Sequence, residues 1–373
     1  MKITCDREKL LSAFQTAATV APTRSPKPIL QNIKLEVSDS KAMLIATDLE
    51  VGIRIEVPGV QTEVPGSAIL STSRFGSILR ESSDEQLHLE ANKQGLTVRG
   101  ERMEFKLLAE DPEEFPAVAA FTEKKFHEVP ARLLREIIRR TLFATDSESS
   151  RFALSGVLVE FLSESILAVG TDGRRLAKME GPAQSIDGHV SGDSMTIIPA
   201  RAMQLIERAL SDSDAEIQVA ARGNDILVKS PRVTIYSRLV EGRFPKWRDV
   251  FPKRENPVKI DLIVGPLYTA VRQAAIVTSE ESRGVDFTFG GGTLVLAGQT
   301  AELGQSRVEL PIPYEGPSIS LVLDPRFLGD FLKVLNPEKS FSLEIKDSES
   351  AMVCSTDDGY GYVIMPMARD KPS

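Results

Sequence analysis

The stretch PARLLREIIRRTLFA, residues 130–144, predicts a helix with two distinct faces, and FALSGVLVEF, residues 152–161, predicts the strand that follows it. Apolar residues recur in 130–144 at the spacing of a helix that buries one side, whereas apolar and polar residues alternate in 152–161. The predicted stripe that packs on a sheet is Leu133, Leu134, Ile137, Ile138 and Leu142, and Arg132, Arg135 and Arg139 lie on the opposite side.

The same succession of helix and strands occurs three times along the chain. The two counterparts of 130–144 are REKLLSAFQTAATVA (7–21) and VGPLYTAVRQAAIVT (264–278), and each also precedes an alternating, strand-like segment. A second helix follows in each copy, with Arg74, Arg201 and Arg326 near its start. Each copy ends on a strand in which Phe105, Tyr236 and Tyr362 correspond. These spacings indicate three repeats of about 125 residues.

The repeats predict an α+β protein, in which two helices per domain pack on antiparallel sheets. Polar, charged and proline-bearing segments at 121–130 and 251–260 are typical of linkers. We therefore expect three domains, at residues 1–124, 127–252 and 253–373.

Composition narrows the class of protein. The chain has 373 residues, of which 42% are hydrophobic and 26% charged, as in a globular protein. Charged residues occupy the start MKITCDREKLL, where a signal peptide would be apolar, so a cytoplasmic protein is expected. No apolar run is long enough to cross a membrane, and Cys5 and Cys354 form no metal-binding or redox spacing.

Charge is distributed unevenly between helices and the rest of the chain. The six predicted helices (7–20, 72–81, 131–142, 200–210, 265–276 and 325–335) hold 13 basic and 5 acidic residues, although the chain carries a net charge of −8. One basic helix face is most often only a solvated surface. Six helices with a basic excess in an otherwise acidic chain indicate instead a surface for the phosphates of duplex DNA, contacted without reading its sequence.

Catalytic chemistry finds little support in the sequence. His88, His127 and His189 are far apart in the chain, and a surface or loop position is expected for each. The glycines at 290–292 predict a hairpin turn, and Thr-Asp at 47–48 and 171–172 also predicts turns. The pair Asp357-Asp358 precedes a glycine and has the pattern of turn residues. An enzyme, or a scaffold that binds only proteins, stays open as an alternative.

Several segments, in order, resemble the bacterial DNA polymerase III beta subunit, the family of sliding clamps. They are PILQNIKLEV and ATDLEVGIR in the first copy, AVGTDGRRLA and LVEGRFPKWRDVFP in the second, and SRGV and YVIMPM in the third. The resemblance covers essentially the whole length. It implies a non-catalytic protein without cofactor or metal, whose two chains join head to tail in a ring around duplex DNA, with helices lining the hole. It also implies a clamp loader and a replicative polymerase as partners.

The resemblance further implies an apolar groove for short peptides of these partners. Without it, YVIMPM would be interpreted as a last edge strand over the core. The groove residues carried over are Leu154, Thr171, Gly173, Arg174, Arg175, Leu176, Pro245, Val250, Val363, Ile364, Met365, Pro366 and Met367. Arg174, Asp249 and Glu349 depart from the family pattern, so peptide preference is expected to differ. The tail ARDKPS runs beyond the usual end.

For DNA and for the ring joint, the resemblance implies two further sets of residues. The resemblance gives Arg24 and Arg74 as DNA contacts, with Arg151 as a compensating residue, and the basic helix faces add Arg132, Arg135, Arg139 and Arg201 to the expected set. Arg151 belongs to DSESSRF, where Glu148 makes the segment a poorer phosphate binder. The joint would bring the strand around Phe105 against Ile276 and Val277 of the other chain; ordinary core packing is the alternative.

Overall fold

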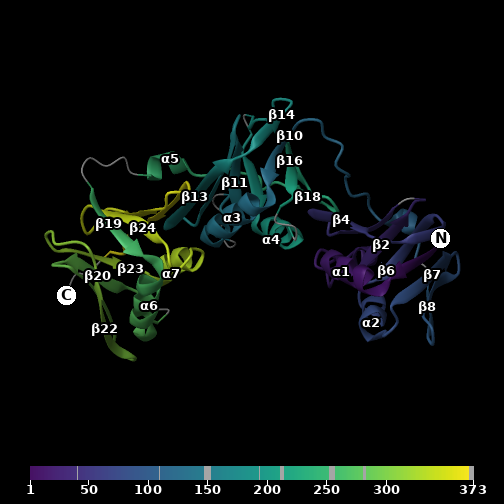
Figure 1. The fold of residues 1–373 in the computed structure, drawn as a ribbon, viewed down its shortest axis with the longest axis horizontal. Coiled ribbons are helices and arrows are strands. Elements are labelled where there is room, and N and C mark those ends of the chain that lie inside the picture. The colour runs from purple at the N-terminus through teal and green to yellow at the C-terminus, as the bar shows by residue number, and fades with distance from the viewer. Residues whose placement is uncertain are drawn as a thin grey trace. The chain divides into compact units, whose positions relative to one another are not determined.

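The computed structural model describes residues 1–39, 41–108, 110–146, 153–192, 194–210, 214–251, 257–279 and 283–368. The chain divides into two units. Unit 1 comprises residues 1–134 and 183–239, and unit 2 comprises residues 135–182 and 240–373. The division falls inside helix α3 (Ala131–Thr141). Figure 1 shows the order of the elements along the chain.

Unit 1 contains two antiparallel sheets with the strand orders β5-β1-β7-β8-β9 and β14-β10-β16-β17-β18-β4-β3-β2-β6. Its elements are β1 (Lys2–Asp6), α1 (Arg7–Ala18), η1 (Pro28–Gln31), β2 (Asn32–Val37), β3 (Ala42–Thr47), β4 (Val51–Val57), β5 (Gln61–Val64), β6 (Gly66–Ser71), α2 (Arg74–Glu81), β7 (Gln86–Asn92), β8 (Gly95–Arg99), β9 (Glu104–Leu108), η2 (Pro112–Glu114), β10 (Phe126–Pro130), β14 (Gln184–Ile186), β15 (Thr196–Pro199), α4 (Ala200–Ala209), β16 (Glu216–Arg222), β17 (Asp225–Lys229) and β18 (Val233–Arg238).

Unit 2 contains a sheet in which β11-β12-β13-β26-β25-β24-β19 follow one another, and a smaller one with the order β22-β21-β20-β23. Its elements are η3 (Leu142–Ala144), β11 (Gly156–Phe161), β12 (Ser165–Thr171), β13 (Arg175–Pro182), α5 (Trp247–Val250), β19 (Val258–Ile263), α6 (Val264–Ala274), η4 (Ala275–Val277), β20 (Val285–Gly290), β21 (Thr293–Thr300), β22 (Gly304–Pro311), β23 (Ile319–Leu323), α7 (Pro325–Lys333), β24 (Ser340–Ile345), β25 (Met352–Ser355) and β26 (Tyr360–Ile364).

The six helices predicted from the sequence are confirmed to within a few residues, and α5 is an additional short one. Local capping explains where two of them begin. The side chain of Asp6 accepts a hydrogen bond from the Lys9 amide (2.9 Å) at the start of α1. At the start of α7, Asp324 accepts one from the Arg326 amide (3.0 Å), and Pro325 occupies the first turn.

The longer helices pack on the sheets within each unit, as predicted for an α+β protein. In unit 1, α1 and α2 pack through the rings of Phe14 and Phe75, whose centroids are 5.3 Å apart, and lie on the same side of the sheet (Figure 1). In unit 2, the ring of Phe331 on α7 stacks against Tyr360 at 5.4 Å and Tyr362 at 5.1 Å. The first contact joins α1 to α2, and the second fixes α7 on its sheet, each by burying large apolar areas.

Strand pairing joins the repeats more closely than linkers alone would. In unit 1, β18 of the second repeat pairs with β4 of the first, with Ile235 opposite Ile53. In unit 2, β13 of the second repeat pairs with β26 of the third, with Leu176 opposite Val363. The larger sheet of each unit is therefore continuous across a repeat boundary.

The expectation of a surface or loop position is wrong for His127, and the expectation that the histidines lie apart is wrong for His127 and His189, although His189 does lie in a loop. His127 on β10 and His189 are both buried, and their Nδ1 atoms are 2.7 Å apart. The Ala221 amide donates to His189 Nε2 at 3.2 Å, so His189 is held neutral in the fold. Burial, together with the neighbouring His127, lowers the pKa of His189. Only His88 is exposed, on β7.

Two turn predictions are confirmed. The hairpin between β20 and β21 turns at Gly291 (φ 57°) and Gly292 (φ 73°), which is backbone that favours glycine. Asp357 and Asp358 lie in the turn before β26, and Asp358 accepts a hydrogen bond from Arg140 at 2.6 Å. Among the described helices, none is both long and apolar enough to cross a membrane.

Candidate functional site

The turn that follows β12 is built by its own Thr-Asp pair, as the sequence predicts. Thr171 Oγ1 donates to the Arg175 carbonyl (2.6 Å) and accepts from the Gly173 amide (3.1 Å). Asp172 Oδ1 accepts from the amides of Arg174 (2.9 Å) and Arg175 (3.0 Å). Gly173 has φ 86°, a value that suits glycine. The turn therefore presents Arg174 and Arg175 in fixed backbone positions.

The first repeat makes the same turn from a different sequence. Thr47 Oγ1 donates to the Val51 carbonyl at 2.8 Å, and Asp48 Oδ1 accepts from the Val51 amide at 2.7 Å. Leu49 stands where the second repeat has Gly173, and it adopts φ 80°. The Thr-Asp pair thus forms the same turn in the first two repeats, and the two arginines that follow it occur only in the second repeat.

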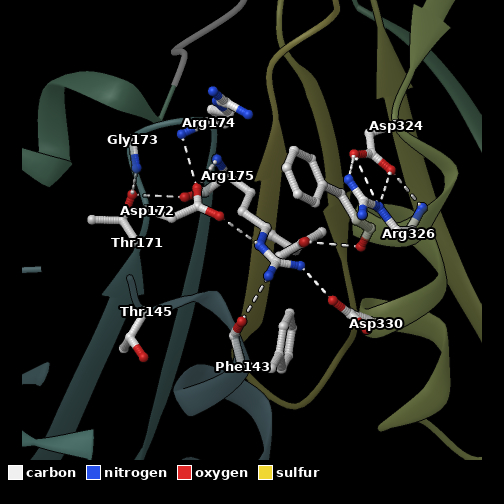
Figure 2. A network of polar contacts seen from close by, with 12 residues as sticks. Phe143, Thr145, Thr171, Asp172, Gly173, Arg174, Arg175, Asp324, Arg326 and Asp330 are labelled. Carbon is white, nitrogen blue, oxygen red and sulfur yellow. Dashed lines mark hydrogen bonds and ion pairs between the residues drawn. The ribbon is translucent and has the colours of Figure 1, made fainter. Parts of the chain in front are cut away.

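Arg175 has a guanidinium that is fully engaged inside unit 2 (Figure 2). Its Nε donates to Asp172 (3.0 Å), and its two terminal nitrogens donate to Asp330 of α7 (2.6 Å) and to the Phe143 carbonyl (2.8 Å). The guanidinium also stacks on the rings of Phe327 (4.6 Å) and Phe143 (5.4 Å). Arg175 therefore ties the turn after β12 to η3 and α7.

Electrostatics keep this buried cation charged. Burial by itself would lower the pKa of Arg175, but the neighbouring Tyr362, Asp330 and Asp172 raise it above its ordinary value. Arg174 is different, because its side chain is exposed and points away from the network in Figure 2. Within the part of the chain that the structure describes, Arg174 forms no ion pair. Two adjacent arginines thus play unlike roles.

The C-terminal segment continues from β26 along the edge of this turn. The Met365 amide donates to the Arg174 carbonyl at 2.9 Å, and the Met367 amide donates to the Val322 carbonyl of β23 at 2.8 Å. Pro366 between them has no amide to donate. Residues 365–367 therefore bridge the two sheets of unit 2, from the turn after β12 to β23.

Strand pairing and the Met365 amide place the turn after β12 beside the C-terminal segment, and the predicted groove residues differ in exposure. Leu154, Thr171, Leu176, Val363 and Ile364 are buried. Pro245 and Pro366 are half-buried, and Gly173 and Arg174 are exposed. Three apolar side chains remain open to solvent: Val250 (40% exposed), Met365 (44%) and Met367 (39%). Exposed methionines are well suited to varied apolar ligands.

Sequence reasoning missed what positions Val250. The segment that leads to α5 passes Ala153, whose amide donates to the Arg243 carbonyl at 3.4 Å. At α5, Glu160 of β11 accepts hydrogen bonds from Trp247 Nε1 (3.3 Å) and from both terminal nitrogens of Arg248 (3.0 and 2.5 Å). The only available signal was the single tryptophan in the chain.

The basic side chains expected to face DNA fall into two groups in unit 1. Arg24 and Arg74 are exposed, and no described residue forms an ion pair with either. Arg201 on α4 is engaged, because it pairs with Asp48 and donates to the Val20 carbonyl (3.2 Å). Arg201 therefore joins the first two repeats rather than standing free.

The arginines of helix α3 also differ in whether they form ion pairs. Arg132 lies 3.3 Å from Asp214, and Arg139 lies 3.6 Å from Glu136 on the same helix. Both arginines are about half exposed or more, so these pairs are weak and open to competition by phosphate. Arg135 is half-buried and forms no ion pair with any described residue. Arg151 lies outside the described residues.

A cavity between α1 and α4 adds cations that the sequence analysis did not select. It has a volume of about 510 Å³, and Lys9, Arg208 and Arg232 are among the residues that line it. All three are exposed. Because α1 and α4 both border this cavity, they lie side by side over the continuous sheet of unit 1.

The residues expected at a joint between chains lie on exposed edges. Phe105 is 42% exposed on β9, an edge strand of unit 1, and Leu108 at the end of β9 is 84% exposed. In unit 2, Ile276 of η4 is 75% exposed, and Val277 beside it is half-buried. Leu303, just before the edge strand β22, is 55% exposed. Leu108 and Leu303 were not selected from the sequence.

Three family models cover most of the chain. They are the N-terminal, central and C-terminal domains of the DNA polymerase III beta subunit, which match residues 1–119, 128–246 and 248–368. A protein of Chlamydia pneumoniae named beta sliding clamp is 30% identical over 370 residues, which is 98% of this chain and 99% of that protein. The beta sliding clamp of Escherichia coli K12 is 29% identical, over 98% of this chain and 100% of its own.

Solved structures show the same similarity. The DnaN sliding clamp of Pseudomonas aeruginosa, in a crystal structure bound to griselimycin, has a TM-score of 0.91 and 27% identity. That comparison covers 99% of this chain and 100% of the Pseudomonas chain. The beta subunit of DNA polymerase III from Caulobacter crescentus has a TM-score of 0.87 and 26% identity, with 99% and 100% coverage. With its three matching domains and its full-length relatives, the chain belongs to the DNA polymerase III beta subunit family.

Proposed function

We propose that this chain is a DNA sliding clamp, a ring that encircles duplex DNA and tethers the replicative polymerase and other replication and repair proteins to it. The observation that carries the proposal is the threefold repeat of clamp-family domains over almost the whole chain. The domains are assigned to residues 1–124, 127–252 and 253–373. The role is mechanical, requires no catalytic step or cofactor, and belongs in the cytoplasm, where bacterial chromosomes are copied.

Electrostatics support weak, sequence-independent contact with DNA. The six predicted helix ranges hold 13 basic and 5 acidic residues, although the net charge of the chain is −8. Arg24 and Arg74 are exposed cations in unit 1, and Lys9 and Arg208 add to them between α1 and α4. Exposed arginine and lysine side chains attract phosphates without reading bases, so the ring can slide.

The ring would close by a head-to-tail joint between two chains. Edge strands expose unpaired backbone groups that readily pair with another chain. β9 with Phe105 and Leu108, and the surface with Ile276 and Leu303, provide two different edges with exposed apolar residues. Two unlike surfaces suit a heterologous joint, which generates rings when the rotation closes.

Peptides of the clamp loader and of polymerases would bind at the groove that Val250, Met365 and Met367 border. Their exposure supports this assignment, because flexible methionine side chains that stay open to solvent suit varied apolar ligands. The griselimycin-bound Pseudomonas relative makes griselimycin a practical probe for this chain.

The test is primer extension on a DNA circle with the cognate polymerase and clamp loader. Adding the chain should lengthen the products made in a single polymerase binding event. The double variant Met365→Ala with Met367→Ala should remove that gain while the chain still dimerises. A chain that leaves product length unchanged, with an active loader present, would exclude the clamp role and favour a scaffold that binds only proteins.

A further inference from the structure

The short helix α5 cannot hold its own position. It has four residues, Trp247–Val250, and no side chain caps its first turn. Helices this short do not persist without tertiary contacts. On one side it borders a hollow of about 950 Å³, which Lys178 and Arg248 help to line, so packing does not confine it there. The position of Val250 therefore depends on what fastens α5 to the sheet.

One carboxylate makes most of the hydrogen bonds that hold α5 on the sheet. Glu160 of β11, whose side chain is 19% exposed, accepts one hydrogen bond from the Trp247 indole and two from the Arg248 guanidinium. A guanidinium that meets a carboxylate through two nitrogens has a fixed orientation as well as a strong attraction. The Arg248 guanidinium also stacks on the Trp247 ring at 4.3 Å. We call Glu160, Trp247 and Arg248 the α5 anchor.

A second contact ties the end of α5 to β26. The ring of Phe251 meets Trp247 edge to face, with centroids 6.4 Å apart. Phe251 also packs over Gly361, where an added Cβ would lie 3.0 Å from the ring and would press it outward. The same strand continues into Met365 and Met367. The two walls of the proposed groove are thus connected through a few contacts on the sheet face opposite Phe331.

We propose that Glu160 is a positioning residue for the peptide groove: by holding α5 through Trp247 and Arg248, it sets where Val250 stands relative to Met365 and Met367. The inference rests on the proposed function, because it concerns the same groove. Without the carboxylate, α5 samples several positions, and only a fraction of molecules presents the groove ready for a ligand. The apparent Kd rises as the inverse of that fraction, so a one-tenth population weakens binding about tenfold.

Trp247 is the only tryptophan in the chain and is 7% exposed, so its emission reports on the anchor directly. The experiment titrates griselimycin into the full chain and into Glu160→Ala and Glu160→Gln. Glu160→Ala should bind about tenfold more weakly, with red-shifted emission and stronger acrylamide quenching. Glu160→Gln keeps an acceptor for the indole, so its affinity and emission should lie between those of the wild type and Glu160→Ala.

Glu36→Gln is the matched control. Glu36 is also a sheet carboxylate, and it accepts a hydrogen bond from Arg54 at 3.0 Å, but it lies in unit 1. The griselimycin affinity and the Trp247 emission of Glu36→Gln should equal those of the wild type. If Glu160→Ala does not fold, the test uses Glu160→Gln and Arg248→Lys. Arg248→Lys keeps the positive charge but cannot make the two hydrogen bonds of a guanidinium to one carboxylate.

The outcomes separate this inference from the proposed function. Normal griselimycin binding by the wild type, with unchanged affinity in the folded Glu160 variants, would overturn the positioning role alone. Unchanged Trp247 emission in those variants would also overturn it, because α5 would then be held by other contacts. A wild-type chain that binds no griselimycin would overturn the groove itself, and the positioning role with it.

Discussion

Removing Arg175 should destabilise unit 2 strongly, whereas removing its neighbour Arg174 should not. The Arg175 side chain is 11% exposed and donates to Asp172, Asp330 and a backbone carbonyl. In Arg175→Ala, Asp172, whose side chain is 16% exposed, would lose its buried cation. Breaking a buried pair by deleting one partner costs about 3–5 kcal/mol. Asp330 is 43% exposed and stays solvated, so we expect the low end, about 3 kcal/mol.

Urea unfolding followed by Trp247 emission measures this difference, because Trp247 lies in unit 2. The midpoint of Arg175→Ala should fall clearly, with the slope unchanged, since the surface exposed on unfolding stays the same. Arg174→Ala is the adjacent control and should keep the wild-type midpoint. Equal midpoints for the two variants, or a loss below about 1 kcal/mol for Arg175→Ala, would refute the assigned role of Arg175.

Three further predictions concern acid stability, DNA and the joint. The pKa of His189 is lowered, so the unfolded chain takes up this proton first; stability should be complete above the unfolded pKa of about 6.5 and decline below it. Thermal unfolding measured between pH 7.5 and 5.5 should show a smaller loss of stability in His189→Gln than in the wild type. The same loss in both proteins would contradict this prediction. Arg24→Ala with Arg74→Ala should weaken duplex binding and reduce the slope of log K against log salt by about 2; an unchanged slope would place the DNA elsewhere. Phe105→Asp, or Ile276→Asp, places a charge at the proposed joint and should give monomers by light scattering. Dimers formed by these variants would show that the joint lies elsewhere.

Periodicity accounts for what the sequence could predict. The buried stripe of α3 and its counterparts recur at helical spacing, so all six long helices were located to within a few residues. The Thr-Asp turns were predictable because their hydrogen bonds are local, as the contacts of Thr171 and Asp172 show. Features that depend only on residues close together in the chain can therefore be predicted from short stretches of sequence.

Features that depend on distant segments were not predictable. The pairing of β13 with β26 joins residues far apart in the chain and leaves no periodic mark in either strand. His127 and His189 meet in the core for the same reason. Nothing local distinguishes Arg174 from Arg175, yet one is exposed and the other is enclosed by Asp172, Asp330 and two aromatic rings.

The anchor of α5 shows the same limit at the candidate site. Resemblance selected Val250, but the contact that positions it comes from Glu160 on β11. A lone glutamate in an alternating strand is most often a solvated residue, and only the fold reveals its two partners on α5. Resemblance therefore supplied candidate surface residues for the site, whereas the contact that supports one of them is visible only in the fold.

The central claim is that the chain is linked to DNA by topology rather than by tight contact. The direct measurement loads the chain onto a nicked circular plasmid with its clamp loader, removes free protein, and follows retention before and after one cut that linearises the circle. We expect a long-lived complex on the circle that is lost rapidly after the cut, with little effect of moderate salt on the circular form. Equal retention on circular and linear DNA, or loss from both on raising salt, would contradict the claim.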